Sequence, residues 1–359
     1  MNDHHQIRIL LAIALRQWKR AEELVRLEPV EPERFVAVCQ AADVHPGVHA
    51  RLERDDRSDL VGPETMDRLA RLRAKVRADN MLLLARAEQS LDLLRRAGVT
   101  PLVLKGLDLL HRVYERFDER TIDDVDLLVR PGELSRAIDA LQAAGWEPPP
   151  EPRKTHYIRS SHHLPMQSPG PVPVEFEIHW NLVQESRYRV DCAAIFDRAG
   201  TVDVGGRPSL RMDDHDLVAH LLLHHFTHYF DPRLKWLLDL ELLAEQPGFT
   251  WREVVDRIRS WRAVAASGMS AIHLRKISPE VVPEELVRGL PVGWWRRALL
   301  WPLRSGHPLE LFGNTRSRRV QLYIAAVLLE RPQMLPGWLL HRALRDRRRG
   351  DNPLDNETA

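Results

Sequence analysis

The sequence is poor in cysteine, in long apolar runs and in net charge. Its 359 residues include two cysteines, Cys39 and Cys192, which lie in unrelated segments without metal-type spacing. A disulfide-stapled secreted scaffold is therefore excluded, and a reduced, cytoplasmic protein is expected. No apolar stretch approaches the ~20 residues of a membrane helix, so no membrane partner is expected. The formal net charge of +1 argues against a globally basic nucleic-acid binder.

The chain does contain enough apolar residues for a large core. Hydrophobic residues make up 44% and charged residues 29%, as in ordinary soluble proteins. Helical periodicity dominates both ends of the chain, and short strands concentrate between them. We therefore expect an α+β fold, in which a small mixed-sheet core is flanked by N- and C-terminal helical regions. The expected boundaries are 1–95 (helical), 96–212 (core), 213–345 (helical) and 346–359 (basic, disordered tail).

Within the core, strand and helix patterns alternate. The expected strands are 99–104, 122–129, 156–159 and 172–180, followed by a β-hairpin at 201–211 around Gly205-Gly206. The expected helices are one that follows Lys105-Gly106 and reaches Phe117, and a second at 131–144. The segment 146–170 is otherwise rich in loop residues.

The most informative residues are two aspartates on one expected strand. Asp124 and Asp126 are two positions apart, and Val125, Leu127 and Val129 fill the alternate positions. Residues i and i+2 of a strand point the same way, so both carboxylates project from one face. Their closeness is unfavourable unless a cation lies between them. This pattern predicts a divalent-metal site, and Mg²⁺ held by carboxylates indicates phosphate chemistry.

A third carboxylate is expected from the strand at 172–180. Glu175, Glu177 and His179 share its polar face, whereas the alternate residues are apolar. Alternation alone does not choose between the two glutamates.

These motifs occur in a recognisable order. Leu104-Lys105-Gly106 opens a helix, Asp124-Val125-Asp126 follows, and Glu177-Ile178-His179-Trp180 and the run 234–239 come later. The ordered set resembles the nucleotidyltransferase superfamily with the DNA polymerase β-like fold. Over roughly residues 85–245, the chain looks most like the bacterial group labelled "nucleotidyltransferase family protein".

The resemblance implies Mg²⁺, as one or two ions, and a nucleoside triphosphate substrate. It implies that Asp124, Asp126 and Glu177 are the catalytic metal ligands, because the family pattern places a glutamate before an apolar-His-Trp run. It also implies nucleotide contacts from a second set of residues: Lys105, Gly106, Arg120 and His179. The acceptor stays open between a small molecule, a peptide and RNA. Arg120 and His179 also have structural interpretations, as partners of neighbouring acids.

One departure from the family pattern favours an alternative. Leu107 follows Gly106, where many active members have serine, so a hydroxyl contact to phosphate is missing. The alternative is a catalytically inactive binding or regulatory module that serves a toxin–antitoxin or biosynthetic-cluster partner.

A group of histidines also lies downstream. His220, His224 and His228 recur every four residues on one helix face. They spread along ~12 Å of helix, so all three cannot bind one ion. We expect a packing or hydrogen-bonding role for them, between the core and the next helix.

Overall fold

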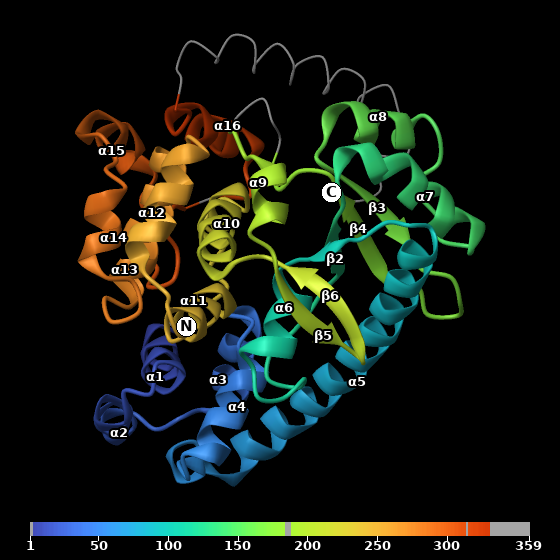
Figure 1. Cartoon of the computed structure of the whole chain (residues 1–359). Coiled ribbons are helices and arrows are strands. Elements are labelled where there is room, and N and C mark those ends of the chain that lie inside the picture. Colours follow the sequence, from blue (N-terminus) through green and yellow to red (C-terminus); the bar gives the residue numbers. More distant parts are fainter. Residues whose placement is uncertain (1–2, 184–187, 314, 331–359) are drawn as a thin grey trace.

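The computed structural model describes residues 3–183, 188–313 and 315–330. In this part of the chain, helices flank both faces of one six-stranded mixed sheet (Figure 1). The α+β class expected from the sequence is confirmed. None of the described helices combines the length and the apolar character that a membrane crossing requires. The expected tail at 346–359 lies outside the described residues.

The chain begins with helices. In order they are α1 (His4–Ala14), α2 (Trp18–Leu27), α3 (Pro32–Ala41), α4 (His45–Arg54), the 3₁₀ turn η1 (Ser58–Leu60) and α5 (Gly62–Arg96). The long helix α5 runs beside the sheet (Figure 1). It ends in a Schellman motif, in which Gly98 has φ +70° and Val99 N–H donates to Leu94 O at 2.9 Å. This turn sends the chain directly into the first strand.

The sheet has the strand order β3-β4-β2-β1-β6-β5. The strands are β1 (Leu102–Val103), β2 (Val125–Leu128), β3 (His163–Gln167), β4 (Glu175–His179), β5 (Gly200–Val204) and β6 (Arg207–Arg211). β2 and β4 are parallel neighbours, whereas β1 runs antiparallel to β2. The hairpin expected around Gly205-Gly206 is β5–β6, and both glycines have the positive φ that its tight turn requires.

Between the strands lie α6 (Lys105–Arg112), η2 (Pro131–Glu133), α7 (Leu134–Ala143), α8 (Arg153–Ser160) and α9 (Cys192–Asp197). After the sheet come α10 (Asp214–Thr227), α11 (Lys235–Ala244), α12 (Trp251–Ser260), α13 (Val264–Ile277), α14 (Glu284–Gly289), α15 (Trp294–Leu300), η3 (Trp301–Leu303) and α16 (Arg318–Val327).

Two hydrophobic cores lie on the two faces of the sheet. One core contains Val125, Leu127 and Phe176 together with the second half of α5 and helix α7. The other contains Leu104 and Leu128 from the opposite face, together with both the N-terminal helices and α10 to α13. The two helical ends of the chain therefore pack into one shared core against the sheet, and β2 is buried on both faces.

Three expectations for the core need correction. Residues 156–159 are helical, in α8, because three prolines and the cap residue Pro152 lead into a helix start rather than a strand. Strand β3 was missed because Pro165 lies within it, and a proline is tolerated there because β3 is an edge strand. The helix expected to reach Phe117 ends at Arg112.

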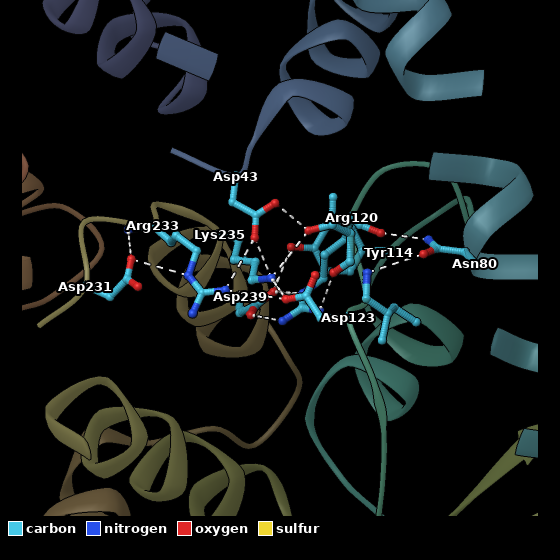
Figure 2. Close-up of polar contacts among 11 residues, drawn as sticks. Asp43, Asn80, Tyr114, Arg120, Asp123, Asp231, Arg233, Lys235 and Asp239 are labelled. Carbon is cyan, nitrogen blue, oxygen red and sulfur yellow. Dashed lines mark hydrogen bonds and ion pairs between the residues drawn. The ribbon is translucent and has the colours of Figure 1, made fainter. Parts of the chain in front are cut away.

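The loop between α6 and β2 is held by a buried ion pair. Arg120 donates to both carboxylate oxygens of Asp239 on α11, through Nε and Nη2, each at 2.8 Å. Tyr114 O–H donates to Asp239 Oδ1 at 2.8 Å (Figure 2). Asn80 of α5 donates to Arg120 O at 2.8 Å, so the loop is also tied to the long helix. Charge-assisted bidentate pairs of this kind fix orientation strongly.

A second set of contacts continues the network toward the N-terminal helices. Lys235 Nζ lies 2.5 Å from Asp43 Oδ2 and 3.0 Å from Asp123 Oδ2. Thr121 donates to Asp43 Oδ1 at 2.7 Å (Figure 2). Residues from the N-terminal helices, the core and α11 thus converge on the loop that leads into Asp124.

Removing Asp239 should destabilise the protein strongly. Asp239→Ala leaves the Arg120 guanidinium buried without its partner, which costs about 3–5 kcal/mol in the free energy of unfolding. Urea unfolding measures the loss. The matched control is Glu245→Ala, an exposed acid at the end of the same helix, which should change stability by less than ~0.5 kcal/mol. Equal losses in the two variants would contradict a stabilising role for the ion pair between Arg120 and Asp239, which we call the clamp.

Candidate functional site

Two carboxylates meet across neighbouring parallel strands. Asp126 of β2 and Glu177 of β4 are Cα partners in the register of the sheet. Asp126 is buried and the Glu177 side chain is 19% exposed. The side-chain alternation expected for β4 is present, because Phe176 and Ile178 enter the core on the opposite face. The sheet therefore turns acids from two distant segments to one side.

Two cationic side chains neutralise this pair. His179 Nε2 lies 2.8 Å from Asp126 Oδ1 and 3.1 Å from Glu177 Oε2. Lys105 Nζ lies 3.2 Å and 3.1 Å from the two oxygens of Asp126. The chain itself thus supplies the positive charge that clustered carboxylates need, so their closeness alone does not require a metal ion.

These contacts set the protonation of the group. Burial alone would raise the pKa of Asp126, but Lys105 and His179 outweigh it and hold that pKa well below its usual range. Burial lowers the pKa of His179, yet its bonds to Asp126 and Glu177 prevail and raise it to about 9. Lys105 keeps a raised pKa despite burial because the acids surround it. At neutral pH the group is an array of opposite charges.

Asp124 has a different environment. It lies one residue before β2, is partly exposed, and burial together with Asp126 raises its pKa to about 7. Asp126, Glu177 and His179 each offer a ligand atom, and these atoms lie within 4.8 Å of one another. Among the described residues, Asp124 belongs to no such three-residue group. The structure therefore groups Asp126 with Glu177 and His179, and leaves Asp124 beside this three-residue group.

Lys105 carries a further mark of function. It opens helix α6 with φ +45°, a left-handed conformation that is uncommon for a residue with a side chain. Such strain tends to accumulate at functional sites. The neighbouring Gly106 has a packing reason of its own, because a Cβ there would lie 2.8 Å from Arg120 Nη1 and 3.1 Å from Ile122 Cγ2.

Arg120 and His179 are both partners of acidic side chains, as their structural interpretations expect. Arg120 is engaged by Asp239, so its guanidinium is committed to the clamp and the implied nucleotide contact loses support. His179 turns its Nε2 to the two carboxylates, which makes it a positioning residue for them. Glu175 is exposed at the start of β4 and is the Cα partner of Gln167, away from Asp126. The geometry thus makes Glu177, and not Glu175, the neighbour of Asp126.

Sequence reasoning missed two histidines beside the site. His163 is the Cα partner of His179, and its Nε2 lies 3.5 Å from Glu177 Oε1. His162 precedes it in the chain, and its ring centroid lies 5.7 Å from that of His179. Burial lowers the pKa of His163 to about 4 and that of His162 further, so both are neutral at pH 7. The adjacent histidine pair was visible in the sequence, but the strand that orients it was not.

Helix α10 brings further histidines toward the same charges. His220 is buried, and its charged form would interact with Lys105, His179 and Asp126. Its column of histidines continues along the helix, with the rings of His224 and His228 4.2 Å apart. The ring centroids of His224 and His228 each lie 5.5 Å from that of Trp236 on α11, so the packing expected against the next helix is present.

The chain belongs to a nucleotidyltransferase family. Residues 28–278, more than half of the chain, match the family described as "Uncharacterised nucleotidyltransferase". The match includes all six strands and the clamp residues of α11. No curated protein matches the sequence.

The donor set fits a divalent metal ion. Asp126 and Glu177 offer carboxylate oxygens from two rigid strands, and both carboxylates are anionic. Oxygen ligands of this kind suit Mg²⁺, which usually takes one or two carboxylates and completes its shell with water and phosphate. Asp124 is a third acid just before the start of β2, and its raised pKa of about 7 leaves it partly protonated at neutral pH.

Lys105 and a metal ion should compete for Asp126. In the absence of metal, we expect the Lys105→Met variant to melt at a lower temperature than the wild type. Added Mg²⁺ should then raise the melting temperature of the variant by about 2–4 °C more than it raises that of the wild type. A difference of this size corresponds to ~1 kcal/mol. Differential scanning fluorimetry with and without MgCl₂ measures both. Lys75→Met, which removes an exposed i,i+4 pair with Asp79, is the control. A Mg²⁺ shift equal in all three proteins would refute the competition.

Proposed function

We propose that the chain is a Mg²⁺-dependent nucleotidyltransferase that transfers a nucleoside monophosphate from a nucleoside triphosphate to an acceptor. An acceptor hydroxyl or phosphate oxygen forms a bond to the α-phosphorus, and the bond from that phosphorus to the β-phosphate oxygen breaks. Pyrophosphate leaves with the electron pair. A hydroxyl acceptor gives its proton to a carboxylate of the site. The acceptor class stays open between a small molecule, a peptide and RNA.

The observation that carries the proposal is the pairing of Asp126 with Glu177 across parallel strands in a member of a nucleotidyltransferase family. In this proposal Asp124, Asp126 and Glu177 hold Mg²⁺. When bound, the ion would offset the charge of the triphosphate and stabilise the attacking and leaving oxygens. His179 orients the two buried carboxylates through its Nε2.

The remaining roles fall at the N-terminus of α6. Backbone N–H groups there have no partner within the helix and, with the helix dipole, favour an anion. Gly106 provides close backbone approach, and Lys105 adds a point charge that can hold a phosphate oxygen. Both residues lie in the first turn of α6, and Lys105 contacts Asp126, one of the carboxylates that the proposal assigns to the metal.

One alternative has a specific observation in its favour. Lys105 and His179 already satisfy the carboxylates by contacts within the chain. Leu107, which follows Gly106 in place of a hydroxyl residue, is buried in the core. A catalytically inactive module, serving a partner in a toxin–antitoxin or biosynthetic system, would use the same fold without turnover.

Isothermal titration tests the binding half of the proposal. We expect the wild type to bind at least one nucleoside triphosphate more tightly with Mg²⁺ than without it. Glu177→Gln should weaken the Mg²⁺-dependent binding at least tenfold, about 1.4 kcal/mol, because it removes a charged ligand. Glu175→Gln is the matched control on the same strand, and its affinity should stay within about twofold of the wild type. Equal weakening in both variants would refute the assignment of Glu177.

Transfer itself is tested with α-labelled nucleoside triphosphates. The protein is incubated with small-molecule, peptide and RNA fractions of a cell extract, with tRNA as a separate sample. We expect label in one fraction for the wild type, and at least a hundredfold less for Asp126→Asn, since ligand loss raises the barrier by several kcal/mol. Mg²⁺-dependent binding without label in any fraction would favour the inactive module.

A further inference from the structure

Three imidazoles gather where β3 begins and β4 ends. His163 and His179 lie directly opposite each other on these antiparallel strands. His162 precedes β3, and the chain bends there. Consecutive residues of a regular strand point to opposite faces, so this bend is what lets both rings lie on one side. His163 Nδ1 is 3.3 Å from His162 Nε2, and each of the three histidines offers a nitrogen within 4.8 Å of the others.

A carboxylate adjoins two of the three rings, those of His163 and His179. Glu177 Oε1 lies 3.5 Å from His163 Nε2, while its other oxygen, Oε2, lies 3.1 Å from His179 Nε2. Glu177 therefore contacts both His163 and His179, and His179 in turn contacts Asp126. We call His162, His163, His179 and Glu177 the histidine cluster.

Unpaired polar atoms around the cluster provide an independent indication of a ligand. In the described part of the chain, His220 is 2% exposed and neither of its ring nitrogens has a hydrogen-bond partner. His179, equally buried, leaves its Nδ1 without one. Buried polar groups without partners are costly and uncommon in folded proteins. The charged form of His220 would interact with His179 and His162, so its unpaired ring belongs to the same region.

We propose that the histidine cluster binds a divalent transition-metal ion, with Zn²⁺ as the preferred ion. Imidazole nitrogen suits Zn²⁺ and neighbouring metals, whereas Mg²⁺ favours an oxygen shell. Three histidine nitrogens and one carboxylate oxygen supply the four ligands that Zn²⁺ usually takes. Glu177, which contacts His163 with one oxygen and His179 with the other, would be shared by the zinc ion and the carboxylate site. Zinc binding shares these residues with the proposed transfer site but does not require the transfer reaction.

The test is a zinc titration of the full chain without nucleotide. Metal is first removed with a chelator, and ZnCl₂ is then added in the presence of millimolar Mg²⁺. We expect about one equivalent of Zn²⁺ per chain, as a single four-ligand site requires. His163→Gln should weaken binding at least tenfold, and the double variant His162→Gln/His163→Gln should abolish it. Co²⁺ substitution adds a spectroscopic measure, because its visible absorption reports nitrogen ligation and should fade in the same variants.

The control is His228→Gln, an exposed histidine at the end of α10, which should bind Zn²⁺ as the wild type does. Circular dichroism and thermal unfolding confirm that each variant folds. Complete displacement of Zn²⁺ by Mg²⁺ would overturn the proposal. Wild-type zinc affinity in the His163→Gln variant would overturn it too. Loss of zinc in His228→Gln alone would move the site to the α10 column and overturn it as well. Because no nucleotide is present, failure of the transfer reaction leaves this result unaffected.

Discussion

The central constraint is the cost of holding Asp126 and Glu177 together with little access to water. Parallel pairing of β2 and β4 forces these carboxylates to be neighbours, and two anions at that distance repel each other unless positive charge compensates. Lys105 and His179 provide that charge from within the chain. The resulting array contains two acidic side chains and two cationic ones, so its charges are balanced within the chain.

The rest of the fold keeps this array in place. The loop before β2 packs Val113, Tyr114 and Ile122 against the two cores. It is also tied in place by polar contacts of Arg120, Asp239 and Lys235. These residues belong to segments far apart in sequence, and their contacts join the core to helices at both ends of the chain (Figure 2). A shared hydrophobic core has the same effect on a larger scale, since it contains the N-terminal helices and α10 to α13 together. The helical ends thus support the site as well as surround it.

The family assignment and the geometry support different parts of the functional conclusion. Membership in an uncharacterised nucleotidyltransferase family suggests nucleotidyl transfer as the general class of chemistry. The geometry adds that Glu177 adjoins Asp126, that Arg120 serves the clamp, and that histidines line the side of the site next to β3. The oxygen donors of Asp126 and Glu177 thus lie beside the nitrogen donors of the histidines, and Mg²⁺ and Zn²⁺ prefer different donors.

The sequence by itself determined the local features. Alternation with period two placed Asp126 on the polar face of β2, and placed Glu177 and His179 together on the polar face of β4. Two adjacent glycines defined the turn of the hairpin. The family resemblance already implied Glu177 rather than Glu175, and strand register makes it the partner of Asp126. Only the tertiary structure decided the other partners: Lys105 for Asp126, Asp239 for Arg120, and His162 and His163 for His179, where an edge strand that contains a proline begins. Alternation and turn signals act over a few residues, whereas strand register and helix packing join residues tens of positions apart. Those pairings leave no local pattern from which they can be read.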